Sequence, residues 1–510
     1  MLQRILIILL LTTPVFAASQ SRDLQRADSF YNRFKYPKAL SSYLKAEKKG
    51  ESVYYVTRRI GDCYRHMKMP EKAVEWYQKT VTFPDVEPDT YFHLGQLLRT
   101  LGRYEESDGY LTRFYTLTRT QAAFRGLSPE DHLQSILSDS GRVEILRLDI
   151  NTRHSEFAPA IWNNKLVFMS NRPGSSPVRT RDARSRESFF DLYAAQIKSL
   201  TTFGRPELFD SRLKTSLNDG PVSFSADGQQ AYITRNTGRT VDGVSELDIV
   251  VARFRDGQWQ KNTTTLPFKI RGFSIAHPAT THNNERIYFA SDMPGGYGGM
   301  DLYYSERRDG FLSQPVNMGP LINTPGNEIF PYVDEKGRLF FASDGHPGLG
   351  GLDIFVALPT PDGYAEPINP GPGINSSHDD FTIAFNEDGL SGYFASNRPS
   401  GSNQNNQNDN LYAFRMIRPL EFTMIDGFVR NQTTGAPEAE VTISVSKSDG
   451  TLVSTFESDE KGRFLVHLLS DVEYKFTFRK RMMEPYEKSI TPTDMKGYAS
   501  YNLQVSMSPR

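Results

Sequence analysis

The sequence predicts a multidomain protein made of an α-helical repeat array, a β-propeller and a small all-β sandwich. Three observations support this fold class. Small and aromatic residues recur every 34 residues near the N-terminus, a strand-and-turn unit recurs five times in the middle, and short alternating strands fill the C-terminal part. We expect the following boundaries: a signal peptide at 1–17, the helical array at 23–140, the propeller at 141–419 and the sandwich at 420–510.

The first residues have the pattern of a secretory signal peptide. Arg4 supplies the positive charge, Ile5 to Leu11 form the apolar core, and Val15-Phe16-Ala17 places small residues at the cleavage site. The apolar run is too short to cross a bilayer as a retained helix. Because no Cys lies near the cleavage site, we expect an exported, periplasmic protein that is not a lipoprotein, does not span the membrane itself and reaches the outer membrane through partners.

The composition excludes some classes of partner. The chain has 59 basic and 60 acidic residues, a formal net charge of −1, and no basic run, which argues against nucleic acid. The single Cys63 has no second Cys with which to form an internal disulfide. It follows Gly61 in a helical pattern, which favours a small buried residue over a reactive thiol.

The helical region repeats with a fixed period. Small residues are spaced by 34 at Ala27, Gly61 and Gly95, and the same spacing relates Ala39 to Ala73 and Tyr43 to Tyr77. This is the tetratricopeptide period, in which small residues let paired helices approach and aromatic residues fill the gap between repeats. Two interpretations remain open: the concave face binds a peptide or helix of a partner, or the array is a spacer that packs on the propeller.

The middle region repeats a hydrophobic strand that ends in a small polar pair, followed by a loop and an Asp or Asn with an aliphatic residue. The Ser or Thr that marks the end of each such strand stands at positions 170, 234, 291, 343 and 396. Short strands and turns at such a period are typical of a β-propeller. We count five blades, and the long first spacing leaves room for a sixth, degenerate one.

One of these units carries a family resemblance. It contains Pro331, the turn Asp334-Glu335-Lys336-Gly337, the strand end Phe341-Ala342-Ser343-Asp344 and the segment Gly350-Gly351-Leu352-Asp353-Ile354-Phe355. This pattern resembles the WD-repeat-like propeller unit of the TolB type, which is common in bacterial envelope proteins. The resemblance implies the fold and leaves the function open, because propellers host many activities.

The C-terminal region has several short strands with turn signals, as in a small β-sandwich. A strand begins at Gly427-Phe428-Val429, a turn follows at Thr434-Gly435-Ala436-Pro437, and a hairpin contains Asp459-Glu460-Lys461-Gly462-Arg463-Phe464. These features resemble the carboxypeptidase regulatory-like domain.

The order of the three regions resembles that of modular envelope proteins of Bacteroidetes, among them components of the type IX secretion system. That resemblance implies protein partners in the envelope. Proteins of this kind typically continue into an OmpA-like domain that grips peptidoglycan. Because the sequence ends at Arg510, we do not expect this chain to bind peptidoglycan directly.

We find no motif of an enzyme or of a resident cofactor. The sequence lacks a nucleophile elbow between a strand and a helix, a His-Glu-x-x-His, a Cys-x-x-Cys and a phosphate-binding Gly-Lys-Ser/Thr loop. We therefore predict no catalytic residues, no metal and no cofactor.

One constellation invites a functional interpretation. An acid or His precedes most of the innermost strands expected of the blades, at Glu156, Asp219, His277, Glu328 and the pair Asp379 and Asp380. If these strands line the central channel, the side chains form a ring that could hold a cation or act as an acid/base pair, as in glycosidases. The alternative is that each acid caps its own blade by accepting backbone N–H bonds, and repetition favours this role.

The sequence as a whole favours a non-enzymatic periplasmic scaffold that mediates protein–protein interactions in the envelope, with type IX secretion or gliding machinery as the specific version. The alternative function is a carbohydrate-binding or carbohydrate-active propeller that uses the channel carboxylates. An enzyme needs carboxylates in unequal environments that converge on an open pocket, so the positions of these acids distinguish the two hypotheses.

Overall fold

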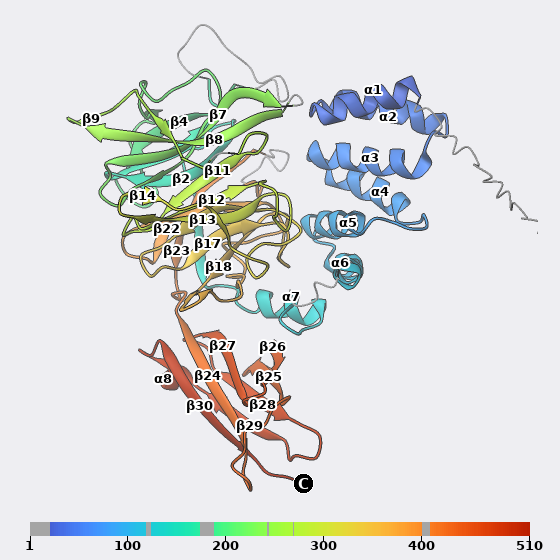
Figure 1. The fold of residues 1–510 in the computed structure, drawn as a ribbon, viewed down its shortest axis with the longest axis vertical. Helices are drawn as coiled ribbons and strands as arrows, with labels where there is room; N and C mark the ends of the chain where they lie inside the picture. Colours follow the sequence, from blue (N-terminus) through green and yellow to red (C-terminus); the bar gives the residue numbers. More distant parts are fainter. Residues whose placement is uncertain (1–20, 119–123, 174–187, 242–243, 269, 400–407) are drawn as a thin grey trace, which may run out of the picture. The chain divides into compact units, whose positions relative to one another are not determined.

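The computed structural model describes residues 21–118, 124–173, 188–241, 244–268, 270–399 and 408–510 (Figure 1). These residues form two compact units, Met1–Pro84 and Asp85–Arg510. The predicted signal peptide lies outside the described residues. Within the described ranges, no helix is long and apolar enough to cross a membrane.

The first unit consists of four helices in two antiparallel pairs. They are α1 (Arg22–Asn32), α2 (Tyr36–Lys48), α3 (Val53–His66) and α4 (Pro70–Thr80). The hydroxyl of Ser21 caps α1 by accepting a hydrogen bond from the N–H of Leu24, and Pro70 begins α4 where no intrahelical donor is needed. The core is built from small and aromatic side chains, among them Ala27, Ala39, Tyr43 and Cys63. A helical N-terminal region is therefore confirmed, and Cys63 is buried.

The 34-residue spacing corresponds to repeated contacts. Tyr43 donates a 2.6 Å hydrogen bond to Asp28, and Tyr77, 34 residues later, donates one of the same length to Asp62. The ring of Tyr77 covers Gly61, where a Cβ atom would lie 3.0 Å from the ring. A glycine at this position therefore lets the two helices of the repeat pack closely.

The second unit begins with three helices, α5 (Pro88–Thr100), α6 (Tyr104–Thr118) and α7 (Pro129–Leu137). Ser128 caps α7, as its place before Pro129 predicts, because its hydroxyl accepts a 3.0 Å hydrogen bond from the N–H of Asp131. Leu133 and Ile136 of α7 pack on Leu349, in a loop of the β region that follows. The last helix is thus fixed to that β region by apolar contacts.

Five antiparallel sheets follow the helices, and each begins with its innermost strand (Figure 1). The first sheet contains β2 (Glu156–Trp162), β3 (Lys165–Ser170), β4 (Asp191–Gln196) and β5 (Glu207–Leu208); the second contains β6 (Asp219–Phe224), β7 (Gln230–Val241), β8 (Val244–Arg255), β9 (Gln258–Trp259) and β10 (Thr264–Thr265). The third contains β11 (Ile275–Thr280), β12 (Arg286–Ser291), β13 (Asp301–Arg308), β14 (Phe311–Leu312) and β15 (Val316–Asn317). In the first and third sheets, the second strand is buried along nearly its whole length, as its unbroken apolar sequence predicts.

The fourth sheet contains β16 (Glu328–Val333), β17 (Leu339–Ser343) and β18 (Asp353–Ala357), next to a small hairpin of β19 (Pro359–Thr360) and β20 (Gly363–Tyr364). The fifth contains β21 (Asp380–Phe385), β22 (Ser391–Ser396) and β23 (Asn410–Met416), and β1 (Val143–Arg147) completes it by pairing with β23. The innermost strands contact one another in the cyclic order β2, β6, β11, β16, β21 and back to β2. The arrangement is propeller-like, and β1 closes it.

The innermost strands share a local irregularity. Their pairing with the second strand shifts register after the first residues, and Ala158, His277, Phe330 and Thr382 have positive φ at this point. Such a bulge re-aims the side chains that follow it. The bulge therefore gives the first residues of each strand, where the predicted acids stand, a different orientation from the residues that follow it.

The last region contains two sheets on one hydrophobic core. One consists of β27 (Arg463–Leu469), β24 (Phe422–Asn431) and β30 (Ser500–Met507); the other consists of β26 (Leu452–Glu457), β25 (Thr442–Lys447), β28 (Tyr474–Arg479) and β29 (Tyr486–Ile490), and the short α8 (Pro492–Met495) precedes β30. Buried Arg142 joins this region to the propeller-like one, because its guanidinium donates to the carbonyl of Pro419 at 2.9 Å and to Asp471 at 3.0 and 3.1 Å.

Candidate functional sites

The predicted acids stand at the start of the innermost strands and bind within their own sheets. Glu156 accepts hydrogen bonds from the backbone N–H and the hydroxyl of Thr152, both at 2.8 Å, and from the hydroxyl of Ser170. Glu328 repeats this arrangement with Thr324 and Ser343, at 2.6 to 2.7 Å. Each of these side chains therefore ties the loop before its strand to the neighbouring strand.

Asp219 and Asp380 follow the same arrangement with an arginine added. Asp219 accepts from the N–H of Thr215 and pairs with Arg235 at 2.8 Å, while Asp380 accepts from Ser376 and pairs with Arg398. Burial raises the pKa of both carboxyls, and the arginines oppose that rise.

The fourth sheet lacks this arginine. Arg172 pairs with Glu156 in the first sheet at 3.1 Å, but the equivalent position two residues after Ser343 is Gly345. A Cβ atom there would collide with the hydroxyl of Thr324. Without a partner charge, burial raises the pKa of Glu328 to about 8. Glu328 is therefore mainly protonated at neutral pH, whereas its counterparts have cationic partners.

His277 and Asp379 occupy different positions from these acids. In the third sheet Ile275 pairs with Ser291, so Ile275 and not His277 is equivalent to Glu156. The ring of His277 stacks on Phe330 with centroids 3.9 Å apart, and burial lowers its pKa to about 3. Asp379 accepts from Asn397 at 2.8 Å and from the N–H of Leu352 at 3.1 Å. Among the described residues, no group of three or more His, Cys, Asp or Glu side chains could hold a metal ion.

The innermost strands do line a cavity, of about 530 Å³, at one end of the ring of sheets. His277 and Thr382 face it, and its lining comes from all five innermost strands. None of the five predicted carboxylates lines it. The bulges explain this separation, because the cavity is bounded by the strand segments beyond them.

The third helix pair binds the propeller-like region through polar side chains. Gln96 stands 34 residues after Asp62 and donates to the carbonyl of Asp344. Buried Arg99 donates to the carbonyl of Gly348 and pairs with Asp108 at 3.0 Å, and Tyr115 donates to the carbonyl of Gly345 at 3.1 Å. The glycine-rich loop 344–351 is thus a docking surface for α5 and α6.

The corresponding face of α3 in the first unit carries aromatic and basic side chains. The guanidinium of Arg59 lies 4.5 Å from the ring centroid of Tyr31 and 5.2 Å from that of Tyr55. The ring of His66 stacks on Tyr36, with centroids 4.4 Å apart, and desolvation in this stack together with the charge of Arg65 lowers its pKa. At neutral pH this aromatic face, which we define as Tyr31, Tyr36, Tyr55, Arg59 and His66, carries a neutral imidazole and the guanidinium of Arg59, which is paired with Asp62 at 3.2 Å.

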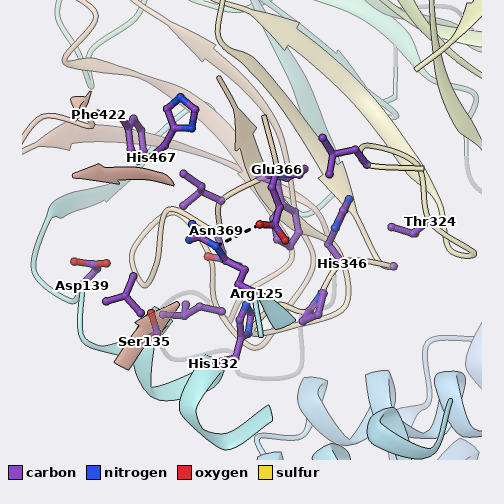
Figure 2. Close-up of a pocket in the computed structure, with 18 of the residues that line it drawn as sticks. Arg125, His132, Ser135, Asp139, Thr324, His346, Glu366, Asn369, Phe422 and His467 are labelled. Atoms are coloured by element: carbon purple, nitrogen blue, oxygen red, sulfur yellow. Dashed lines mark ion pairs between the residues drawn. The ribbon is translucent and has the colours of Figure 1, made fainter. Parts of the chain in front are cut away.

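A second cavity, of about 510 Å³, lies within the second unit (Figure 2). Its walls come from α7, from loops of the third and fourth sheets and from the C-terminal β region. Arg125 and Glu366 face each other there as an ion pair of 3.6 Å, and burial raises the pKa of Glu366 while Arg125 opposes the rise. Burial lowers the pKa of His132 to about 3 and that of His346 to about 4, so both rings are neutral at pH 7.

Sequence reasoning missed the residues of this second cavity. Arg125 and His132 belong to no motif, and Glu366 is far from both in the chain. Of the docking residues, Gln96 had a signal, since it replaces the Asp62 of the preceding repeat, whereas Arg99 repeats the residue type of Arg65 and had none. That signal shows a departure from the repeat and does not show what replaces it.

Comparisons with known proteins support the helical repeat. The tetratricopeptide repeat family model matches residues 88–121. No curated protein sequence matches the chain. Among solved structures, TolB from Acinetobacter baumannii is 12% identical, with 57% of this chain and 68% of that chain covered and a TM-score of 0.29.

Two enzymes are similar to the same extent. A gluconolactonase from Xanthomonas campestris is 16% identical to this chain. The match covers 54% of this chain and 90% of the gluconolactonase, with a TM-score of 0.32. An α-L-arabinofuranosidase from Lactobacillus brevis is 12% identical to this chain. The match covers 57% of this chain and 95% of the arabinofuranosidase, with a TM-score of 0.34.

Proposed function

We propose that this protein is a non-enzymatic scaffold that holds other proteins together in the bacterial envelope. The observation that carries the proposal is the different use of equivalent repeat positions. In the second unit, Gln96 and Arg99 bind backbone carbonyls of loop 344–351. In the first unit, Asp28 and Asp62 bind tyrosines of their own repeats, and the aromatic face of α1 to α3 remains partly exposed. Anchoring the third repeat while the first two present a surface is what a scaffold requires.

The aromatic face has the chemistry of a protein-binding surface. Tyrosine and arginine dominate the binding energy of protein interfaces because they bury a large area and also form directional bonds. Arg59 is held between two tyrosine rings, which limits the conformational entropy that it loses on binding. A peptide or helix that brings apolar and acidic side chains would complement this face.

The carbohydrate alternative has weaker support. It requires carboxylates that converge on an open cavity, whereas Glu156, Asp219, Glu328 and Asp380 bind within their own sheets and do not line the 530 Å³ cavity. A structural role for each acid accounts for all of its contacts. We therefore retain the proposal that the protein is not an enzyme.

The finer assignments belong to the same proposal. We propose that the five sheets are the blades of a TolB-type propeller, that the last region is a carboxypeptidase regulatory-like sandwich, and that the protein is exported to the periplasm and reaches the outer membrane through partners. The order of regions resembles that of PorE of the type IX secretion system. Participation in that system or in gliding machinery is the specific version of the scaffold function.

The test is an affinity capture of partners from detergent-solubilised envelope of the source bacterium with three forms of the full chain. The wild type is compared with Arg59→Ala, which removes the cation from the aromatic face, and with Lys48→Ala, an exposed control on α2. We expect envelope proteins that the wild type and the control retain and that Arg59→Ala loses. Equal recovery by all three forms, or recovery of none, would refute the assignment of the binding face. A form without residues 21–84 then tests whether any binding depends on the first unit.

A further inference from the structure

The 510 Å³ cavity of Figure 2 has the size and composition of a small-molecule site. Such sites usually measure about 300 to 1,000 Å³ and combine a mostly apolar wall with a few polar groups. Its apolar wall is formed by residues of three separate regions: Pro320, Leu321, Pro347, Ile368 and Val453. Neither the proposed scaffold function nor the channel hypothesis uses this cavity.

Direct contacts hold the walls of the cavity in place. Lys447 of β25 pairs with Asp139 at 2.9 Å and donates to the hydroxyl of Ser138 at 2.6 Å, at the end of α7. The N–H of Thr455 in β26 donates to the carbonyl of Arg125 at 3.1 Å. Because these bonds join α7 and the segment before it to the C-terminal sheets, a ligand does not have to assemble the site.

Most polar groups around the cavity already have partners. Tyr115 donates to Gly345, His346 binds the carbonyl of Ile322 through Nε2 at 2.8 Å, and Lys447 is paired. The Nε atom of Arg125, the Nδ1 atom of His132 and the Nδ2 atom of Asn369, in contrast, are buried without a hydrogen-bond partner among the described residues. His132 is 7% exposed. The cavity therefore has unused capacity for hydrogen bonds at Arg125, His132 and Asn369.

The geometry at Arg125 indicates what kind of group fits. Its Nε atom lies 3.6 Å from the Glu366 carboxylate, which is too long for a hydrogen bond. A donor and an acceptor that stand side by side complement a group with both functions on one side, and a primary amide or a lactam has its carbonyl and an N–H on the same side, unlike a trans secondary amide. The charges around the cavity cancel in pairs, Arg125 with Glu366 and Lys447 with Asp139, which favours an uncharged ligand.

We propose that this cavity binds a small, uncharged and largely apolar molecule that carries an amide group. The amide carbonyl accepts a hydrogen bond from Arg125, and its N–H donates to Glu366. The apolar body packs against the wall that Leu321, Ile368 and Val453 form. His132 offers a further hydrogen-bonding atom on the α7 side.

The test uses a matched pair of probes, phenylacetamide and methyl phenylacetate, titrated against the full chain by ligand-observed NMR. Both have the ring and the carbonyl, but the ester lacks the N–H. A hydrogen bond to a charged group changes affinity by roughly tenfold or more, so we expect the amide to bind about tenfold more tightly. Glu366→Leu removes the acceptor and should abolish this preference, with ester binding retained.

Two variants on one helix locate the site. Ser135 lines the cavity, whereas its neighbour Gln134 is exposed. Ser135→Trp should abolish binding of both probes, and Gln134→Trp should leave it intact. Leu321→Trp fills the opposite wall from an exposed position and replaces Ser135→Trp if that variant does not fold. Binding of neither probe, equal affinity for amide and ester, binding that survives cavity filling, or loss in the Gln134→Trp control would each overturn the proposal.

Discussion

The protonation of Glu328 gives a sharp prediction, because Glu328 and Glu156 occupy equivalent positions in two sheets and only Glu156 has a cationic partner. Its pKa rises from 4.5 to about 8 by burial without a cation, whereas Glu156 pairs with Arg172. Glu328→Gln replaces a protonated acid by an amide of the same shape. Glu156→Gln removes a charge and leaves Arg172 beside a neutral group. The two substitutions should therefore have unequal costs at pH 7.

The magnitude follows from proton linkage. Between pH 4.5 and about 8 the folded state holds one proton that the unfolded state has released, so stability falls as pH rises. At 1.36 kcal/mol for each pKa unit, the whole shift corresponds to about 5 kcal/mol, of which about 2 kcal/mol is lost between pH 6 and pH 8. Glu328→Gln should remove this destabilisation, which amounts to about 3 kcal/mol at pH 7, and should therefore not lower the stability there. Glu156→Gln should cost roughly 1.5 to 3 kcal/mol, as expected for a hydrogen bond to a charged group.

The assay is urea unfolding followed by tryptophan fluorescence at pH 6, 7 and 8. The chain has three tryptophans, and Trp162 and Trp259 belong to the first two sheets. A Trp76→Phe background therefore restricts the signal to the propeller-like region. If Glu328→Gln and the parent lose stability with the same slope between pH 6 and pH 8, Glu328 does not titrate there and the reasoning is wrong. An equal cost of the two substitutions at pH 7 would refute it as well.

Three further predictions concern buried bonds. Arg99→Leu should destabilise the docking of α5 and α6 on loop 344–351 by about 3 to 5 kcal/mol, because it leaves Asp108 without its partner; faster hydrogen exchange in α5 and α6, with no change in β24 to β30, is the expected readout. Tyr77→Phe should cost more than Tyr43→Phe, by about 1 kcal/mol, because Asp62 is only 3% exposed while Asp28 is partly exposed, and each carboxylate keeps one other donor, Arg59 at Asp62 and Tyr55 at Asp28; thermal unfolding of the first unit measures both, and equal costs would contradict the argument. Gly345→Ala should destabilise the fourth sheet by about 1 to 3 kcal/mol through the collision with Thr324, whereas Gly109→Ala in α6, where a Cβ atom meets no atom within 4 Å, serves as the control for a glycine substitution without a collision.

The candidate sites were only partly predictable. The acids before the innermost strands were found as a repeated pattern, and the structure shows four of the five, all but Asp379, accepting hydrogen bonds from a Thr or Ser four residues earlier. His277 was placed with them because it stands before a similar strand, but it lies two residues beyond the equivalent Ile275. A bulge shifts the register there, and the spacing of residues in a sequence does not reveal a bulge.

The sequence by itself determined the order and type of the elements. A 34-residue period, unbroken apolar strands and regular turns are local patterns, and they arise from helix and strand geometry that neighbouring residues control. The cap of α7 is likewise local, because Ser128 stands directly before Pro129 at the start of the helix.

Only the tertiary structure decided which side chains meet. Arg125 pairs with Glu366, Lys447 with Asp139, and Arg99 with a carbonyl 249 residues away. Such contacts depend on how loops from separate sheets pack, and no periodicity encodes them. The pKa of Glu328 depends on the same kind of fact, because the close approach of Thr324 to Gly345 removes the place for an arginine. Burial and partner charge are properties of the packed chain, and they set the chemistry of residues that look alike in sequence.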